Sequence, residues 1–171
     1  HARLDAGVDG VVGTTGWTEE SYARVRTHAE EAGRAVLIAP NFAMGAVLAM
    51  KFAAMAAPYF ESAEVIEMHH PGKVDAPSGT AVATARGIAR ARAEAGLGDM
   101  PDATEMDALG SRGGRVDGAP VQAVRLRGLT ASEETLLGNE GEQLVIRTAP
   151  FDRVSFMLGL LPGVRRVVGR P

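Results

Sequence analysis

Short apolar runs and longer amphipathic stretches alternate along the first forty residues. Residues 8–12 and 35–39 are apolar runs of strand length, and each run ends in a turn. Residues 19–32 between them have helical length, with Thr18 at the N-cap position, two acids in the first turn and Gly33 at the end. A strand, a helix and a strand in this order predict a βαβ unit with parallel strands.

The middle of the chain predicts two helices around one apolar strand. Residues 45–60 are rich in Ala, Met, Val and Leu and carry one charge, Lys51, so we expect a helix that is buried on most of its faces. Residues 63–68 form an apolar, partly β-branched run that predicts a strand. A second helix should begin near Ser78 and extend over residues 80–95.

The next part predicts a long loop and three strands. Residues 96–119 are rich in Gly, Asp and Pro, which is typical of a loop. Strands follow over residues 121–127, 132–137 and 143–148, and a turn joins the last two. With residues 63–68 they predict a mixed sheet of about four strands, covered by two helices on one face. The other face should be partly apolar and exposed, which favours oligomerisation.

The last segment, residues 153–168, has the apolar periodicity of a helix. We expect Asp152 to open this helix and Pro162 to kink or interrupt it. Strands that alternate with helices place the whole chain in the α/β class.

Composition excludes several classes of protein. The 171 residues are 46% hydrophobic, which supports a core, and the net charge of −3 offers no electrostatic footprint for nucleic acid. The absence of cysteine rules out a disulfide framework and fits a reducing compartment. No apolar run in the sequence is long enough to span a membrane. We therefore expect a cytoplasmic protein with neither nucleic acid nor membrane as its partner.

The stretch between the central strand and its following helix carries the densest chemistry. Residues 67–80 read Glu-Met-His-His-Pro-Gly-Lys-Val-Asp-Ala-Pro-Ser-Gly-Thr. The first backbone amides of a helix that begins at Ser78 attract a carboxylate or phosphate, and Lys73 adds a full positive charge. These groups predict a site for a small, multiply anionic molecule.

The adjacent His69 and His70 should point to opposite faces of an extended strand. One imidazole can act as an acid while the other binds a carboxylate or a backbone carbonyl, because imidazole titrates near neutrality. The alternative is one structural and one solvated histidine. Glu67 and Asp75 are also metal-ligand types, but adjacent histidines lack the spacing of known zinc helices and no Cys is present, so we expect no metal site.

Three motifs in order resemble the 4-hydroxy-tetrahydrodipicolinate reductase (dihydrodipicolinate reductase) family of bacterial lysine and diaminopimelate synthesis. Residues 67–81 meet every fixed position of the family pattern E-x-H-H-x-x-K-x-D-A-P-S-G-T-A, and residues 13–16 and 39–42 agree as well. The resemblance continues to about Arg166. It implies a homotetrameric enzyme that reduces a small cyclic dicarboxylate with NADH or NADPH.

The resemblance also implies a role for each motif residue. His69 is the expected proton donor, and Lys73 is the second catalytic residue, which holds a substrate carboxylate. The expected substrate-binding residues are His70, Ser78, Gly79 and Thr80. The expected cofactor-binding residues, at the carboxyl ends of two strands where ligands of such sheets bind, are Gly13, Thr14, Thr15, Gly16, Ala39, Pro40, Asn41 and Phe42.

The same resemblance implies three segments. Residues 1–42 would be the last part of a Rossmann-like dinucleotide-binding domain, and residues 43–151 an α+β substrate-binding and tetramerisation domain. Residues 152–171 would return to the first domain as a helix. No G-x-G-x-x-G here follows a strand and opens a helix, so we expect the glycine-rich front of the nucleotide domain to be missing from this chain.

Two other functions remain open. Without the phosphate-binding loop, the chain can be an inert binding and oligomerisation module, which a test of nucleotide binding through Trp17 fluorescence would reveal. A Schiff-base enzyme that uses Lys73 is the third option, although a lysine beside an acid lacks the desolvation that activates such a residue.

Overall fold

A computed structural model of the protein describes residues 2–14 and 16–168. The chain divides into two compact units. Unit 1 comprises residues 1–44 and 153–171, and unit 2 comprises residues 45–152. Within the described residues, no helix combines the length and the apolar character needed to cross a membrane.

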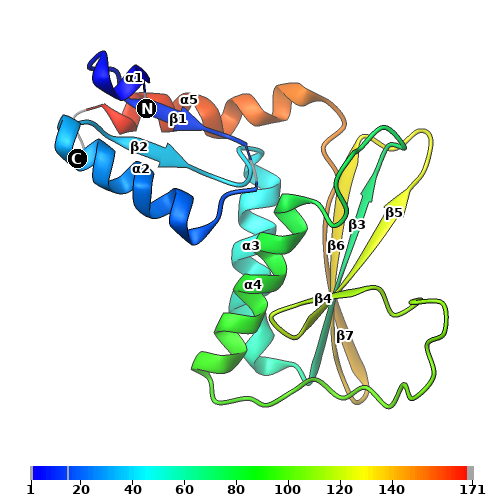
Figure 1. The fold of residues 1–171 in the computed structure, drawn as a ribbon. Coiled ribbons are helices and arrows are strands. Elements are labelled where there is room, and N and C mark those ends of the chain that lie inside the picture. The colour runs from blue at the N-terminus through cyan, green and yellow to red at the C-terminus, as the bar shows by residue number, and fades with distance from the viewer. Residues whose placement is uncertain (1, 15, 169–171) are drawn as a thin grey trace. The chain divides into compact units, whose positions relative to one another are not determined.

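Unit 1 contains a parallel strand pair flanked by helices (Figure 1). Strand β1 (Gly10–Val12) pairs with β2 (Val36–Ile38), and α2 (Glu19–Ala32) connects them. Three further elements complete this unit: α1 (Ala2–Asp5), the 3-10 turn η2 (Arg153–Phe156) and α5 (Met157–Val167). The predicted βαβ unit is confirmed, although both strands are shorter than expected.

Helix α2 begins and ends where the sequence predicts. The Ser21 amide donates to Thr18 Oγ1 at 3.2 Å, and the Thr18 amide donates to Ser21 Oγ at 2.8 Å. This capping box satisfies amides that a helix start otherwise leaves open. Gly33 ends the helix with a φ of 61°, a left-handed backbone that glycine adopts without strain.

The C-terminal helix differs from its prediction. The segment opens with η2 rather than with an α-helix at Asp152, and α5 runs through Pro162 without a break. A Cβ at Gly159 would collide with the Phe42 carbonyl oxygen, and one at Gly163 would lie 3.0 Å from Leu37 Cδ2. This close packing holds α5 on both sides of the proline, so the expected interruption is wrong.

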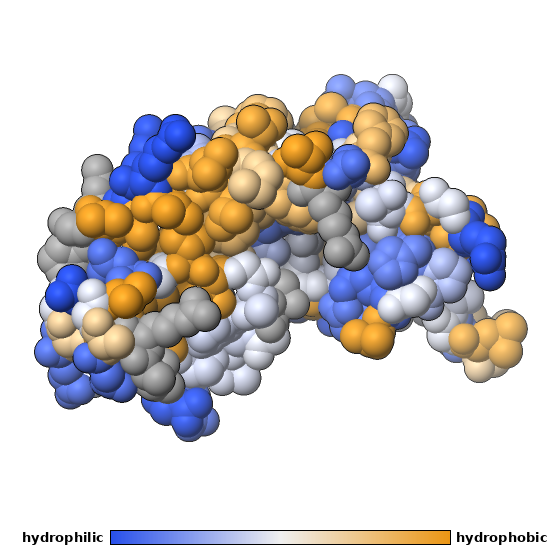
Figure 2. Space-filling view, turned by 90° about the horizontal axis from the view of Figure 1, so that it is seen from above, coloured by the Kyte–Doolittle hydropathy of each residue, from blue (hydrophilic) through white to orange (hydrophobic). Residues whose placement is uncertain are grey.

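Apolar side chains gather over α5 on the face of unit 1 that Figure 2 shows. Four of them are exposed on this helix: Met157, Leu158, Leu161 and Val164. The helix therefore presents Gly163 to β1 and β2, Gly159 to Phe42, and larger apolar side chains outward.

Unit 2 is a five-stranded mixed sheet with two helices on one face (Figure 1). Its strand order is β4-β5-β3-β6-β7. The central β3 runs parallel to β5, whereas the other neighbouring pairs are antiparallel. The strands are β3 (Ser62–His69), β4 (Gly114–Val116), β5 (Ala119–Arg125), β6 (Ala131–Asn139) and β7 (Glu142–Thr148).

The sequence prediction of about four strands missed β4. This strand lies inside the predicted loop over residues 96–119 and pairs with β5 across a two-residue turn. Both turn residues have positive φ, 50° at Asp117 and 89° at Gly118. An Asp-Gly pair is a common hairpin turn, but here it is hidden among many other Gly and Asp residues.

Small side chains allow α3 (Met44–Ala56) and α4 (Gly79–Glu94) to pack closely beside the sheet. A Cβ at Gly87 of α4 would lie 3.7 Å from Ala54 Cβ of α3. The buried core comprises Ala53, Ala57, Ala63, Val65, Ala81, Ala85, Ile88, Ala119, Val121 and Leu137.

Helix α3 is less buried than the sequence predicts. Ala46, Ala49 and Ala53 are buried, but the large apolar side chains on its other side, including Phe52 and Met55, are exposed. The helix also ends before Phe60, because the 3-10 turn η1 (Ala57–Tyr59) follows at Pro58. The expectation of burial on most faces is therefore wrong in this chain, where only an alanine row meets the core.

The sheet face away from the helices is open. Val124 on β5 and Val145 on β7 are 37% and 46% exposed, and Leu126 just after β5 is 58% exposed. Met68 pairs with Val124 and Leu136 with Val145 in the register, so apolar side chains line up across the strands. The predicted partly apolar open face is present.

Candidate functional site

The loop over residues 70–78 joins the carboxyl end of β3 to the start of α4. His69 is the last residue of β3, and Ser78 is the N-cap of α4. Both of these residues are hydrogen-bonded to one buried side chain, Glu67. This carboxylate therefore connects the two ends of the loop.

Glu67 is fully buried and takes part in four hydrogen bonds. Its Oε1 accepts from Arg125 Nη2 at 2.8 Å and from the Ser78 amide at 3.1 Å. Its Oε2 accepts from Arg125 Nη1 at 2.9 Å and lies 2.5 Å from His69 Nδ1. A carboxylate offers about four acceptor positions, so this one is saturated.

Electrostatics keep Glu67 ionised inside the protein. Burial acts to raise the pKa of Glu67, but the hydrogen bonds from Arg125 and His69, and the charges of both, outweigh burial and lower that pKa below its ordinary value. The same bidentate contact raises the pKa of Arg125. The pair is thus a carboxylate and a guanidinium in direct contact.

Arg125 also holds the middle of the loop. It lies at the end of β5, at the register position of His69. Its Nη2 donates to the Asp75 carbonyl oxygen at 2.6 Å as well as to Glu67. One guanidinium therefore attaches the loop backbone to the carboxylate that contacts His69.

The two histidines have different surroundings. The His69 side chain is 14% exposed and its Nδ1 faces Glu67, which leaves Nε2 as the ring nitrogen available to a ligand. His70 comes after the strand and is exposed. Across residues 2–14 and 16–168 its ring has no hydrogen-bond partner, and it lies over Gly72, where a Cβ would be 3.3 Å from His70 Nδ1.

Lys73 and the start of α4 supply the positive character of the loop. Lys73 forms an ion pair with Asp75, and this contact lowers the pKa of the Asp75 carboxyl. Ser78 Oγ accepts from the Ala81 amide at 3.2 Å, and Gly79 and Thr80 are the first residues of the helix. The predicted substrate residues therefore share one short segment, whereas their contact with a substrate carboxylate stays a prediction.

A second buried carboxyl, Glu133, lies opposite Glu67 on β6. Glu133 Oε1 lies 2.6 Å from Thr84 Oγ1, and its Oε2 is buried without a hydrogen-bond partner among the described residues. Burial raises the pKa of Glu133, the Thr84 contact opposes this shift, and the charge of Glu67 raises the pKa further.

The Thr84 hydroxyl gives independent information on this carboxyl. Its oxygen also lies 3.1 Å from the Thr80 carbonyl oxygen. A hydroxyl has one proton to donate: with an ionised Glu133 the Thr84 hydroxyl donates to Oε1, and with a protonated Glu133 it can accept from the carboxyl and donate to the Thr80 carbonyl oxygen. Both distances are compatible with a neutral acid, and burial shifts the pKa of Glu133 in that direction.

In unit 1 the two predicted cofactor motifs meet beyond the carboxyl ends of β1 and β2. A Cβ at Gly13 would lie 2.9 Å from a Phe42 ring carbon, so this position accepts only glycine without a shift. The Ala39 amide donates to the Val12 carbonyl oxygen at 3.1 Å, which extends the pairing into the segment that Pro40 continues.

The remaining residues of the two motifs are fixed mainly through backbone groups. The Ala43 amide donates to Asn41 Oδ1 at 2.8 Å. The Trp17 indole donates to the Thr14 carbonyl oxygen at 3.0 Å, and Gly16 has a φ of 86°. Thr15 lies outside the described residues. The cofactor role of these residues stays a prediction.

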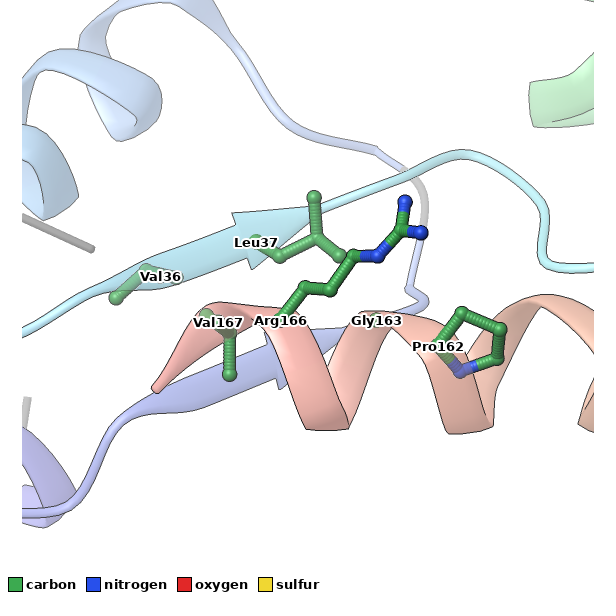
Figure 3. Close-up of a pocket in the computed structure, with 6 residues that line it drawn as sticks. All are labelled: Val36, Leu37, Pro162, Gly163, Arg166 and Val167. Atoms are coloured by element: carbon green, nitrogen blue, oxygen red, sulfur yellow. The ribbon is translucent and has the colours of Figure 1, made fainter. Parts of the chain in front are cut away.

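A cavity of about 370 Å³ in unit 1 contains none of this chemistry (Figure 3). Val36 and Leu37 of β2 line it together with Pro162, Gly163, Arg166 and Val167 of α5. Apart from Arg166 these residues are apolar, and no predicted site residue lines the cavity. Because of this lining, the cavity is not the candidate site.

Sequence reasoning gave Arg125 no functional role and considered Glu67 only as a metal-ligand type. A signal for Glu67 was present, because it follows Ala63 and Val65 in the buried phase of β3. A charged residue at such a position needs a partner. The partner Arg125 carried no comparable signal, since only the pairing of β3 with β5 brings it there.

Comparisons with known proteins agree with one another. A family model described as "Dihydrodipicolinate reductase, C-terminus" matches residues 45–171. The 4-hydroxy-tetrahydrodipicolinate reductase of Beutenbergia cavernae is 61% identical over 172 residues, which cover 100% of this chain and 70% of that protein. The protein of the same name from Streptomyces coelicolor is 59% identical, over 98% of this chain and 68% of its own length.

A solved structure is similar as well. The dipicolinate-bound dihydrodipicolinate reductase from Paenisporosarcina sp. TG-14 matches with a TM-score of 0.76 and 43% identity. The match covers 96% of this chain and 62% of that one. The chain therefore spans between 62% and 70% of the length of these three proteins.

Proposed function

The chain belongs to the dihydrodipicolinate reductase family, and on this premise we propose that it carries the substrate-binding part of an NADH- or NADPH-dependent reductase. The reaction converts 4-hydroxy-tetrahydrodipicolinate to tetrahydrodipicolinate in lysine and diaminopimelate synthesis. One hydride and one proton enter the substrate and one water leaves. The residues of this chain must therefore bind a dicarboxylate and deliver a proton.

The observation that carries the proposal is the contact between His69 and Glu67 beside the N-cap of α4. It places an oriented imidazole next to a helix start, which attracts a carboxylate. The relative from Paenisporosarcina is described as dipicolinate-bound, and dipicolinate is a dicarboxylate, which supports the same ligand class here.

The substrate carboxylate would be bound by the loop and the first turn of α4. The Lys73 ammonium and the amides of Gly79 and Thr80 supply positive charge and donors. His70 and the Ser78 N-cap flank these groups in the sequence and would contact the same ligand. This arrangement holds the ring in a fixed orientation.

His69 would deliver the proton. Because Nδ1 is engaged by Glu67, a protonated imidazole presents its second N–H from Nε2. The proton moves from Nε2 to the substrate carbon next to the one that receives hydride. The imidazole that remains is neutral and still donates from Nδ1 to Glu67.

A bound NADH or NADPH supplies the hydride. Residues 13–16 and 39–42 would hold its nicotinamide end, because they follow the carboxyl ends of β1 and β2, where ligands of such sheets bind. In the sequence, Thr14 and Thr15 follow Gly13 and add two hydroxyl-bearing side chains to the motif. The chain contains no glycine-rich fingerprint that would hold the phosphates.

We also propose a homotetramer in the cytoplasm. The exposed Val124, Leu126 and Val145 give the open sheet face of unit 2 an apolar surface that association would cover. The biosynthetic role of the named relatives supports the location.

The His69→Gln variant tests the function. We expect turnover, followed by oxidation of NADH or NADPH, to fall by about 100-fold or more, because a general acid is removed. The affinity for dipicolinate, measured by calorimetry, should change by less than about threefold. His70→Gln should instead raise KM more than it lowers kcat. Equal losses in kcat and affinity for His69→Gln would overturn the assignment.

Nucleotide binding separates this function from an inert binding module. NADH or NADPH should quench Trp17, which lies next to the predicted nicotinamide turn. If the protein binds dipicolinate but neither nucleotide changes the Trp17 fluorescence, the chain acts as a substrate-binding module and the reductase proposal fails.

A further inference from the structure

We propose that Glu67 and Arg125 are positioning residues that fix both the ring orientation and the tautomer of His69. The inference rests on the proposed function, because it assigns a purpose to the imidazole that delivers the proton. Neither residue touches the reacting atoms in this scheme. Both act through His69.

The hydrogen bonds of Glu67 decide which His69 nitrogen carries the proton. An ionised carboxylate accepts hydrogen bonds and donates none. The 2.5 Å contact with Glu67 Oε2 therefore requires His69 Nδ1 to be the donor. In the neutral ring Nε2 then has a free lone pair, and in the protonated ring Nε2–H is the group available to a ligand.

Arg125 stabilises the ionised form of the buried Glu67. Glu67 has no solvent-exposed surface, and an isolated carboxylate there would take up a proton. The two-pronged contact of Arg125, at 2.8 and 2.9 Å, keeps the charge and also fixes the plane of the carboxylate. The fixed position of Oε2 in turn sets the direction in which the His69 Nδ1–H points.

Two further contacts attach the Glu67–Arg125 pair to the loop and to the start of α4. The Ser78 amide fixes Oε1 of Glu67 to the helix start, and the Asp75 carbonyl oxygen accepts from Arg125. The ring of His69 is therefore oriented relative to the first turn of α4, where the substrate carboxylate is proposed to bind. Orientation of this kind lowers the barrier of a proton transfer.

The Glu67→Gln variant gives a specific prediction. All four partners of this side chain are donors, but a glutamine amide has one acceptor oxygen and one NH₂ group. The Ser78 backbone amide can only donate a hydrogen bond, whereas Nδ1 of a neutral His69 ring can either donate or accept one. We expect the glutamine NH₂ to face His69, which then accepts at Nδ1 and carries its proton on Nε2.

Nuclear magnetic resonance of ¹⁵N-labelled histidine in the purified protein measures this change directly. The wild type should show the Nδ1–H tautomer of His69 at a pH where the ring is neutral, and Glu67→Gln should show the Nε2–H tautomer. Glu133→Gln is the matched control, since it makes the same change at a buried position opposite Glu67 and should leave the tautomer unchanged. An unchanged tautomer in Glu67→Gln would overturn the inference.

Kinetics give a second readout that a general loss of stability would not reproduce. Glu67→Gln should lower kcat by about tenfold or more with KM changed by less than about threefold, because a glutamine NH₂ that faces Nδ1 disfavours the protonated imidazole that donates from Nε2. In a His69→Gln background the same substitution should have almost no effect on kcat. Equal losses in both backgrounds would show that Glu67 does not act through His69.

Arg125→Lys keeps the test decisive if Glu67→Gln does not fold. Lysine preserves the charge but loses the planar, two-pronged contact. The Nδ1–H tautomer should persist while kcat falls, and this fall should again disappear when His69 is glutamine. If His69→Gln itself leaves turnover intact, the proposed function fails, whereas the tautomer measurement still decides the positioning role.

Discussion

Glu67 on β3 and Glu133 on β6 lie opposite each other and are both buried, yet their surroundings differ completely. Glu67 faces a guanidinium, an imidazole and a backbone amide. Glu133 faces one hydroxyl, and one of its oxygens has no hydrogen-bond partner among the described residues. The pKa of Glu67 is lowered, while burial and the charge of Glu67 raise the pKa of Glu133.

The comparison shows that burial alone does not decide the charge of a carboxyl group. Burial acts in the same direction on both pKa values, and donors reverse its effect at Glu67 only. The member of the pair with the lowered pKa is the one connected to His69 and Ser78. The carboxylate of Glu67 therefore lies where the two ends of the loop over residues 70–78 are attached.

Removal of the cation should produce the largest effect. Arg125→Met leaves the Glu67 carboxylate buried without a counter-charge, so we expect the free energy of unfolding to fall by about 3 kcal/mol at neutral pH. Urea denaturation followed by circular dichroism measures this loss. The double variant Glu67→Gln/Arg125→Met removes both charges and should recover part of the stability.

A small loss of stability would contradict the difference between the two glutamates. A loss of less than about 1 kcal/mol in Arg125→Met would mean that Glu67 does not depend on the guanidinium for its charge. The two glutamates would then differ less than their hydrogen bonds indicate.

The acid limb of the stability curve should show the next largest effect. The folded pKa of Glu67 lies below its ordinary value of 4.5, so the unfolded chain binds the proton more tightly. The stabilisation is present above pH 4.5 and is lost as the pH falls through the lowered pKa, by about 1.4 kcal/mol for each unit of lowering. Urea titrations between pH 3 and 6 should therefore show a shallower acid loss in Glu67→Gln than in the wild type.

Elements whose signals are local could be predicted from the sequence. Thr18 and Ser78 are N-caps that start α2 and α4 at the expected residues, and the hairpin of β6 and β7 lies where its turn residues indicate. Strand β4 was missed because its Asp117–Gly118 turn lies in a segment rich in the same residue types. The burial of α3 was overestimated because a uniformly apolar helix does not reveal which face meets the core.

The candidate site was predictable as a list of residues but not as a network. The adjacency of His69, Lys73 and Ser78 is given by the sequence itself. The contact of Glu67 with Arg125 depends on the parallel pairing of β3 and β5, which joins residues that are 58 positions apart. No local pattern encodes such a pairing, so the group that orients His69 emerged only from the fold.

Loss of the N-cap hydroxyl of α4 should have a smaller effect on stability. Ser78→Ala removes the hydroxyl that accepts from the Ala81 amide but keeps the backbone amide that donates to Glu67. We expect the free energy of unfolding to fall by about 1 kcal/mol. The matched variant Thr18→Ala removes the corresponding cap of α2. A similar fall in the free energy of unfolding there would show that both losses come from capping alone. Neither variant changes the charge of Glu67.

Glu133→Gln should have the smallest effect, because a neutral amide resembles the protonated carboxyl. Its NH₂ group can donate to Thr84 while Thr84 donates to the Thr80 carbonyl oxygen. Near pH 4.5 we expect the free energy of unfolding to change by less than about 0.5 kcal/mol, since most of this interaction is retained.

The sign of the pH dependence at Glu133 is opposite to that at Glu67. The folded pKa of Glu133 lies above 4.5, so its contribution to stability is present below pH 4.5 and is lost as the pH rises through the raised pKa. Glu133→Gln cannot lose a proton, so its stability relative to the wild type should increase with pH above 4.5 in urea titrations. A constant difference across that range, or a large loss at neutral pH, would mean that Glu133 is ionised and that the two neighbouring carboxyls are equivalent after all.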